Sequence, residues 1–416
     1  MEKLEFPEGF LWGAATSAHQ IEGDNHNDWS EWEKSPERIA QLKKEGKDPA
    51  DFISGKACDS YHRYREDFDI AKELGHNVHR FSIEWSRIEP EEGKFDEREM
   101  EHYKTLITDL RERGIEPMVT LWHFTNPVWF AKKGGFLSER SPQYFTRYVK
   151  YVVDNLCDRV GLWITFNEPS SVYGGFSYLL GQWPPQKKSF FKYLRVQNNF
   201  IRAHTLAYRQ IKKIYAAIPP VRPGSSSTSH NIRAQVGWAE NYRYPVVPWY
   251  LRWLGSIFTY FRFLRFLKKT APYQDFIGLN YYTIARLPGS YDVLPRQAAV
   301  SIMGWEIYPY GIFHVLKSVA KFKKPVYITE NGIADASDER RLKFIKDHLR
   351  WIHGSIAHGV DVRGYIYWSL LDNFEWSHGF GPRFGLAEID FKTFKRTVRP
   401  SALEYAHICR NNMLEY

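Results

Sequence analysis

The sequence predicts an α/β protein with a single-domain (β/α)8 barrel, a TIM barrel whose functional site lies at the C-terminal face of the strands. Eight short apolar segments alternate with longer amphipathic ones along the whole chain. Several of the short segments are apolar without interruption, as parallel strands buried on both faces should be. The chain has 416 residues, 43% hydrophobic and 25% charged, which suits one barrel domain spanning 1–416.

The strand-like segments are rich in Val, Ile, Tyr, Trp and Phe. In chain order they cover 10–16, 77–85, 116–124, 162–168, 234–241, 275–283, 325–332 and 363–373. A doubly wound open sheet is the alternative architecture. The Gly-rich phosphate turn that often marks such sheets is missing after the first segment, where "GAATSAHQIEG" contains no G-x-G-x-x-G. We therefore expect the barrel.

Between the strands, apolar residues recur at helical spacing. The stretch 96–114 predicts a helix that ends at Gly114. Its apolar stripe consists of Met100, Tyr103, Ile107 and Leu110. The stretch 338–359 repeats this pattern, with Asp338 as the expected N-cap. The Pro- and Ser-rich stretch 218–231 is expected to be a long loop before the fifth strand rather than a domain boundary.

The net charge of +9 is compatible with binding to nucleic acid or to an anionic membrane. The basic residues are scattered along the chain and no nucleic-acid recognition motif accompanies them, so we favour a solvated basic face. The three cysteines, Cys58, Cys157 and Cys409, have no C-x-x-C spacing, so we expect neither disulfides nor a cysteine metal site. The N-terminal residues lack a secretory pattern. These features together predict a cytoplasmic protein.

Polar and aromatic side chains recur at the same end of nearly every expected strand. In chain order they are Gln20, Glu22, Arg80, Glu84, Trp85, Trp122, His123, Asn167, Glu168, Asn280, Tyr282, Glu330, Asn331, Trp368, Asp372, Glu375 and Trp376. Each has an ordinary explanation by itself; an Asn-Glu-Pro sequence, for example, can simply end a strand. Their recurrence at seven strand ends predicts one polar pocket at the C-terminal face.

Two carboxylates in this set point to a chemistry. Glu168 and Glu330 end the fourth and seventh strands, from which their side chains can face each other over a central pocket. Paired carboxylates with aromatic walls suit cleavage of a glycosidic bond, with one as acid and the other as nucleophile or base. No metal-ligand spacing, G-x-S-x-G elbow or Walker loop is present. We therefore expect no metal and no cofactor.

Six sequence blocks resemble, in order, those of glycoside hydrolase family 1, the β-glucosidase and β-galactosidase type of barrel. They are "FPEGFLWGAATSAHQIEG", "WITFNEP", "DFIGLNYYT", "YITENG", "WSLLDNFEW" and "RFGL". The resemblance runs from about residue 6 to residue 406. It implies a retaining β-glycosidase that hydrolyses small β-linked glucosides, galactosides or fucosides through a covalent glycosyl-enzyme. Retention requires the two carboxyl groups to lie about 5–5.5 Å apart.

The resemblance also implies roles for individual residues. Glu330 matches the nucleophile and Glu168 the acid/base, whose pKa should be raised. Arg80 and Tyr282 match the groups that hydrogen-bond the nucleophile, and the guanidinium should lower its pKa. The sugar-binding set matches Gln20, His123, Asn167, Asn280, Trp368, Glu375 and Trp376. The presence of Glu375 and Trp376 implies a neutral sugar rather than a phosphosugar, and that of Glu168 implies an O-glycosidase rather than a thioglucosidase.

The chain departs from the family pattern in places. Phe124 and Tyr310 stand where many relatives have Trp and an acidic residue, and the region between the fifth and sixth strands is short. Loops there shape the side of the site that binds the leaving group, the aglycone. Within this region, 249–269 is aromatic and cationic. It is compatible with a membrane surface or a partner helix, although we favour a barrel helix whose apolar face packs on the sheet.

Two alternative functions remain open. The glycosyl-enzyme of the same site could be intercepted by an acceptor alcohol, which would make the protein a transglycosidase. The chain could also be a non-catalytic sugar-binding or membrane-associated scaffold that uses 249–269. The intact set of Glu168, Glu330, Arg80 and Tyr282 argues against a pure binder, since binding does not require an acid paired with a nucleophile.

Overall fold

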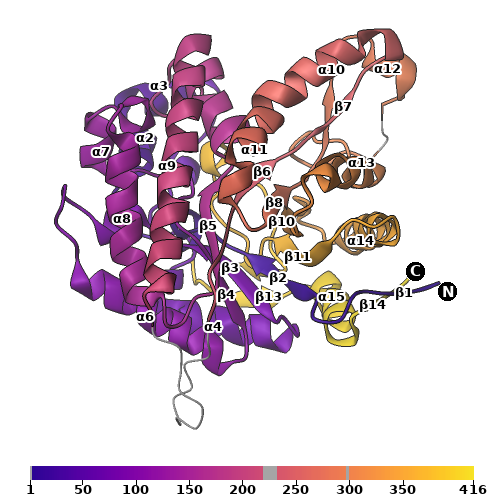
Figure 1. Cartoon of the computed structure of the whole chain (residues 1–416), viewed down its shortest axis with the longest axis horizontal. Helices are drawn as coiled ribbons and strands as arrows, with labels where there is room; N and C mark the ends of the chain where they lie inside the picture. The colour runs from indigo at the N-terminus through magenta and orange to yellow at the C-terminus, as the bar shows by residue number, and fades with distance from the viewer. Residues whose placement is uncertain (1, 219–231, 297–298) are drawn as a thin grey trace.

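In the computed structural model, which describes residues 2–218, 232–296 and 299–416, eight parallel strands close into a barrel (Figure 1). The order of the strands round the barrel is their order along the chain. They are β2 (Leu11–Ala15), β3 (Val78–Ser82), β4 (Glu116–Thr120), β5 (Leu162–Asn167), β6 (Gln235–Asn241), β8 (Ile277–Asn280), β10 (Val326–Asn331) and β11 (Val362–Trp368). The predicted (β/α)8 barrel is confirmed.

The strands are buried on both faces because side chains fill the barrel and helices cover its outside. All six residues of β5 are buried, as the uninterrupted apolar pattern predicts. Successive residues of β5 belong to different clusters: Ile164 packs with Met118 and Ile366, whereas Trp163 joins the larger cluster beneath the helices. The barrel is therefore a packed core, and open space occurs only at its ends.

Helices surround this barrel (Figure 1). The α-helices are α1 (Ala18–Ile21), α2 (Asp28–Glu33), α3 (Pro36–Lys44), α4 (Ser60–Glu73), α5 (Trp85–Ile88), α6 (Glu97–Glu112), α7 (Val128–Lys132), α8 (Ser141–Leu156), α9 (Phe190–Ala216), α10 (Arg252–Thr259), α11 (Arg265–Thr270), α12 (Ser290–Val293), α13 (Tyr310–Val319), α14 (Arg341–Ala357) and α15 (Pro400–Asn411). Shorter or irregular helical segments are η1 (Pro49–Phe52), η2 (Gly135–Leu137), η3 (Pro169–Leu180), η4 (Trp249–Leu251), η5 (Tyr260–Leu264), η6 (Ala271–Tyr273), η7 (Ala320–Phe322) and η8 (Trp376–His378).

In the part of the chain that the structure describes, three two-stranded sheets lie outside the barrel. The N- and C-terminal segments pair as β1 (Lys3–Glu5) and β14 (Met413–Glu415). Strand β7 (Tyr244–Val246) pairs with β9 (Ile284–Arg286), and β12 (Ala387–Ile389) pairs with β13 (Arg396–Val398). Because β7 and β9 follow directly after β6 and β8, they extend the rim of the barrel at its C-terminal face.

The helix predicted over 96–114 is confirmed as α6. The Asp96 carboxylate accepts hydrogen bonds from the backbone N–H groups of Arg98 and Glu99, which caps the helix. All four residues of the predicted stripe are buried, and Gly114 follows the helix with a φ of +74°. This left-handed conformation is one that glycine adopts without strain.

The predicted N-cap of the helix over 338–359 is wrong. Helix α14 begins three residues later, and Asp338 instead bonds Ser401 through its carboxylate. The capping acceptor is Asp335, whose Oδ2 lies 2.9 Å and 3.2 Å from the backbone nitrogens of Arg340 and Arg341. The turn between Asp335 and the helix brings its carboxylate to the free N–H groups, which sequence spacing alone does not reveal.

The segment 249–269 differs in part from the expected packed helix. It consists of η4, α10, η5 and most of α11 rather than one helix. Its second half packs inward as expected, with the Phe266 ring 4.3 Å from that of Trp238. In its first half, Trp249 and Trp253 are exposed to solvent. The prediction that the whole apolar face packs on the sheet is therefore wrong for this half. The loop predicted over 218–231 lies outside the described residues, apart from Ile218.

Candidate active site

The predicted residues gather at the C-terminal end of the barrel around a cavity of about 490 Å³. Eight of them line it: His123, Asn167, Glu168, Tyr282, Glu330, Trp368, Glu375 and Trp376. The other three, Gln20, Arg80 and Asn280, lie directly behind and donate hydrogen bonds to Glu375, Glu330 and Glu168, respectively. The polar and aromatic residues at the strand ends therefore do gather around one pocket.

Glu330, near the end of β10, is held by two strong donors from other strands. Arg80 donates from Nη1 to Oε1 at 2.7 Å, and the Tyr282 hydroxyl donates to Oε2 at 2.7 Å. Arg80 is itself buried and fixed by Thr120 and by the Thr329 carbonyl. Both carboxylate oxygens are therefore occupied by groups that stabilise a negative charge.

The balance of effects on Glu330 differs from the sequence-based expectation. Burial raises the pKa of Glu330, and the charge of Arg80 together with the hydrogen bond from Tyr282 lowers it. Arg80 therefore lowers the pKa of Glu330, as predicted. The net shift of the pKa is nevertheless upward, because burial of the carboxylate outweighs these two partners.

Glu168 has weaker support. It follows β5, with its backbone nitrogen 2.8 Å from the Ala239 carbonyl oxygen, and its Oε1 accepts a hydrogen bond of 2.8 Å from the neutral amide of Asn280. Burial raises the pKa of Glu168 well above its usual range, and the negative charge of Glu330 raises it further. Because only Glu330 is paired with a guanidinium, a proton shared by the two carboxyl groups resides on Glu168.

Four non-glycine residues at the pocket have a left-handed backbone. Phe124, Glu168, Gln186 and Trp376 have φ angles of +75°, +44°, +54° and +49°. Such a conformation costs an L-residue roughly 1–2 kcal/mol. Residues of this kind cluster at functional sites, where the surrounding structure enforces them. Here the strain falls on Glu168, on Gln186 and on two aromatic residues of the pocket wall.

Asn167 connects the two carboxylates to the histidine. Its Oδ1 accepts hydrogen bonds from Arg80 and Asn280, and its Nδ2 lies 3.1 Å from His123 Nε2. Burial and the nearby Arg80 lower the pKa of His123 well below its usual value, so its ring is neutral. With Nε2 accepting from Asn167, the proton sits on Nδ1, which is buried and has no partner among the described residues. This leaves one donor free for a ligand.

Glu375 and Gln20 form a second polar pair in the pocket. Gln20 Nε2 lies 3.2 Å from Glu375 Oε2 and 2.9 Å from Asn373 Oδ1. Burial and the charge of Glu330 raise the pKa of Glu375 to about 8. At neutral pH the carboxyl group of Glu375 is therefore largely protonated, and it can both donate to and accept from hydroxyl groups. The rings of Trp368 and Trp376 both lie nearly parallel to the ring of His123, with centroids 5.8 Å and 5.9 Å away.

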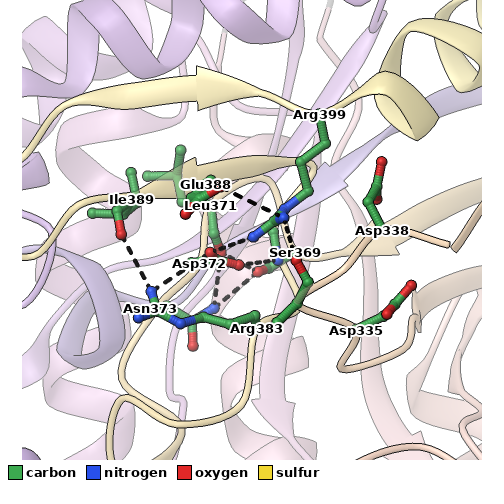
Figure 2. A network of polar contacts seen from close by, with 12 residues as sticks. Asp335, Asp338, Ser369, Leu371, Asp372, Asn373, Arg383, Glu388, Ile389 and Arg399 are labelled. Atoms are coloured by element: carbon green, nitrogen blue, oxygen red, sulfur yellow. Dashed lines mark hydrogen bonds and ion pairs between the residues drawn. The ribbon is translucent and has the colours of Figure 1, made fainter.

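A buried ionic network fixes the loop that carries Glu375 (Figure 2). Asp372 accepts from Arg399 Nη2 at 2.8 Å and from the backbone N–H of Gly385 at 2.8 Å, and Arg383 lies 3.6 Å away. Asn373 donates to Ser369 Oγ at 2.8 Å in the same loop. Two guanidinium groups thus hold the chain between β11 and η8 in place, which positions the pocket side chains that follow.

Comparison with known proteins identifies the family. The profile described as Glycosyl hydrolase family 1 matches residues 2–236 and 265–414. The chain belongs to this family. It is 33% identical to beta-glucosidase A of Thermotoga maritima over the whole of both chains. It is 30% identical to a beta-galactosidase of Sulfolobus acidocaldarius, over 98% of this chain and 96% of that one.

Solved structures agree with this assignment. A beta-glycosidase from Pyrococcus horikoshii is 38% identical and superposes with a TM-score of 0.85, over 100% of this chain and 97% of that one. A family 1 β-glucosidase from Thermotoga maritima superposes with a TM-score of 0.87 at 30% identity, over the whole of both chains. The protein is therefore a glycoside hydrolase with the fold of its family.

Some pocket residues of this family 1 hydrolase escaped the sequence analysis. Arg243 follows β6 and lines the cavity, with its guanidinium carbon 5.9 Å from the centroid of the Trp305 ring. Burial lowers the pKa of Arg243 to about 10. Trp305 and Phe384 pack against the ring of Tyr282. Arg243 stands two residues after Asn241, the end of the fifth strand, so the pattern of polar residues at strand ends also predicts it. Trp305 does not follow a barrel strand, and this pattern does not predict it.

Besides Asp372, two of the strand-end carboxylates have structural roles instead. Glu22 bonds Arg87 and Tyr103, and Glu84 accepts from Thr125 and Ser86. Neither lines the pocket. The ordinary explanation of a buried, hydrogen-bonded polar group therefore applies to both.

Proposed function

We propose that this glycoside hydrolase is a retaining β-glycosidase that acts on small β-linked glucosides, galactosides or fucosides. Glu330 is the nucleophile and Glu168 is the acid/base. One observation carries the proposal: Arg80 and Tyr282 both hydrogen-bond Glu330, whereas Glu168 receives its bond from the neutral Asn280 amide. The names of the relatives, beta-glucosidase and beta-galactosidase, support the substrate class.

The proposed reaction has two steps. Glu330 attacks the anomeric carbon while Glu168 protonates the departing oxygen, which yields a covalent glycosyl-enzyme. Glu168 then removes a proton from the water that hydrolyses this ester. The charge of Glu330 is one cause of the raised pKa of Glu168. Formation of the ester removes that charge, so the pKa of Glu168 falls when the residue must act as a base.

The sugar is proposed to be neutral. The free Nδ1–H of His123 and the protonated carboxyl group of Glu375 provide a donor and a mixed donor–acceptor for adjacent hydroxyls. Trp368 lines the same cavity and supplies an apolar face for the sugar ring. Gln20, Asn167 and Asn280 orient these groups through the hydrogen bonds described above. Hydrolysis is the favoured outcome over transfer to an alcohol, since it is the reaction of the family.

The proposal is tested with nitrophenyl β-glucoside, β-galactoside and β-fucoside. Wild-type protein should hydrolyse at least one of them, and ¹H NMR of the first product should detect the β-anomer. A 2-deoxy-2-fluoro substrate should label Glu330, as located by peptide mass analysis. An α-anomeric first product would contradict the double displacement. Absence of turnover on all three sugars would contradict the proposed substrate class.

We also propose that 1–416 form one catalytic domain that works in the cytoplasm without a cofactor or metal. The closed barrel built from both halves of the chain supports a single domain. The three unpaired thiols of Cys58, Cys157 and Cys409 suit a reducing compartment. Activity should be unchanged after dialysis against EDTA, because the carboxylate pair needs no Lewis acid. A loss restored by added metal would contradict this part.

A further inference from the structure

The net positive charge of the chain is concentrated in one stretch. Between residues 169 and 274 the sequence has sixteen Lys and Arg residues and a single acidic residue, Glu240. The rest of the chain has more acidic than basic residues. The basic residues are therefore spread along the whole chain, as expected, and the net positive charge of this stretch arises from its lack of acidic residues. This stretch includes η3, α9, α10 and α11; α9 contacts η3 and α11, and η5 joins α10 to α11.

Exposed aromatic and aliphatic side chains gather beside this charge. Fourteen large apolar side chains of the described residues are exposed, and eight of them fall between 249 and 302. Trp249 is 77% exposed, and Trp253 and Ile257, one helical turn apart on α10, are 58% and 50% exposed. Tryptophan is usually well buried, so a helix whose aromatic side faces solvent indicates an interaction surface.

The exposed residues are neighbours in space. Helix α10 packs against the β7 segment through Gly255, where an added Cβ would lie 3.1 Å from Val247, so its opposite side faces out. An added Cβ on Gly289 would lie 2.7 Å from Pro248, which brings α12 beside Trp249. We call this surface the aromatic rim. It comprises Trp249, Tyr250, Trp253, Ile257, Tyr260, Tyr291 and Val293.

Exposed cations accompany the aromatic rim. Arg252 lies within it, and Lys268 and Lys269 follow in α11, where Lys268 Nζ is 5.7 Å from the Tyr260 ring centroid. Lys188 is exposed and lines the active-site cavity. Because β7 extends the rim of the barrel from β6, the aromatic surface lies on the same side of the molecule as the cavity mouth. The family profile does not match 237–264, which contains the part of the aromatic rim from Trp249 to Tyr260.

We propose that the aromatic rim docks this enzyme on an anionic lipid bilayer, with α10 lying in the interface. Trp and Tyr side chains favour the interfacial region of a bilayer, and Lys and Arg are attracted to anionic headgroups. No helix within the described residues is long and apolar enough to cross a membrane, so the contact is superficial. A second copy of the chain fits less well, because two such cationic surfaces repel each other.

The test is co-sedimentation with vesicles of phosphatidylglycerol and phosphatidylcholine, compared with phosphatidylcholine alone. Wild-type protein should bind the anionic vesicles in low salt, and several-fold more weakly at high ionic strength. The double variant Trp249→Ser/Trp253→Ser should bind about tenfold more weakly. Leu403→Ser is the matched control, since Leu403 is 55% exposed on α15, outside the aromatic rim. Both variants should hydrolyse a nitrophenyl glycoside at the wild-type rate, which also shows that they fold.

Three results would overturn the proposal. The first is absence of wild-type protein from the anionic vesicle pellet in low salt. The second is binding of the double variant to anionic vesicles as strong as that of the wild type, which would show that charge alone attracts the protein to the bilayer. The third is a dimer in sedimentation velocity that the double variant loses, which would assign the aromatic rim to a second copy. Because the vesicle assay does not depend on catalysis, these results are separate from a failure of the proposed function.

Discussion

The two carboxylates of the active site have the same setting in the fold but different partners. Glu330 and Glu168 are both buried at the C-terminal ends of barrel strands. Arg80 from β3 and Tyr282 after β8 bond Glu330, whereas Asn280 bonds Glu168. Position in the barrel thus brings a carboxylate to the pocket, and the side chains from neighbouring strands decide whether it holds a charge or a proton. Four substitutions test this difference.

Glu330→Gln should have the largest effect, because it removes the nucleophile and the negative charge together. We expect kcat/KM on nitrophenyl glycosides to fall roughly 10⁴- to 10⁶-fold, as for other enzymes that lose a nucleophile. Glu8→Gln, at an exposed position, is the control and should match wild type. Retention of more than about 1% of the activity in Glu330→Gln, a loss smaller than that expected even for a general acid–base, would contradict the nucleophile assignment.

Glu168→Gln should reduce the rate by roughly 10²- to 10⁴-fold, the range for loss of a general acid–base. The loss should be greatest for poor leaving groups, which need protonation, and smallest for dinitrophenyl glycosides. Added azide should restore turnover and give a β-glycosyl azide, because azide attacks the glycosyl-enzyme without help from a base. If azide instead restores Glu330→Gln and gives a β-glycosyl azide, the two roles are exchanged.

Tyr282→Phe removes one hydrogen bond to the carboxylate of Glu330 while it keeps the ring that packs on Trp305. Hydrogen bonds to charged groups contribute about 1.5–3 kcal/mol, so the rate should fall about tenfold to a hundredfold. The bond favours the ionised carboxylate, so its loss raises the pKa of Glu330. The acidic limb of the pH–rate profile should therefore move to higher pH. An unmoved acidic limb would show that Tyr282 does not stabilise the charge.

Arg243→Gln should have the smallest effect. The guanidinium of Arg243 favours the ionised form of Glu168, so its removal should raise the pKa of Glu168 further. The alkaline limb of the pH–rate profile, where Glu168 loses its proton, should shift upward by less than about one pH unit. Arg252→Gln, an exposed arginine on α10, is the control. A downward shift of the limb would contradict this electrostatic role.

The sequence predicted the parts of the fold and site that depend on local pattern. Buried parallel strands leave continuous apolar runs, and their ends leave polar residues at fixed places, so the barrel and the cluster around Glu330 could be found. Asp335 and Asn373 act through turns whose geometry brings distant atoms together, which spacing does not encode. Asn373 stands inside a recognised block, yet only the structure places it 2.9 Å from Gln20.

The segment 249–269 illustrates a different limit. Its amphipathic pattern correctly predicted helical structure, but a pattern cannot distinguish an apolar side that faces the barrel from one that faces solvent. The answer depends on what already covers the barrel at that point. Phe266 packs against Trp238, whereas Trp253 remains exposed to solvent.

The absence of acidic residues from 169–239 and 241–274 has a consequence for how the molecule moves in solution. A protein with one strongly cationic side and an acidic remainder has a large electric dipole moment. In the field of any anionic surface or polymer, it rotates during its approach, so that α9, α10 and α11 arrive first. Within about a Debye length, roughly 8 Å at physiological salt, its encounters are therefore oriented before any side chain makes contact.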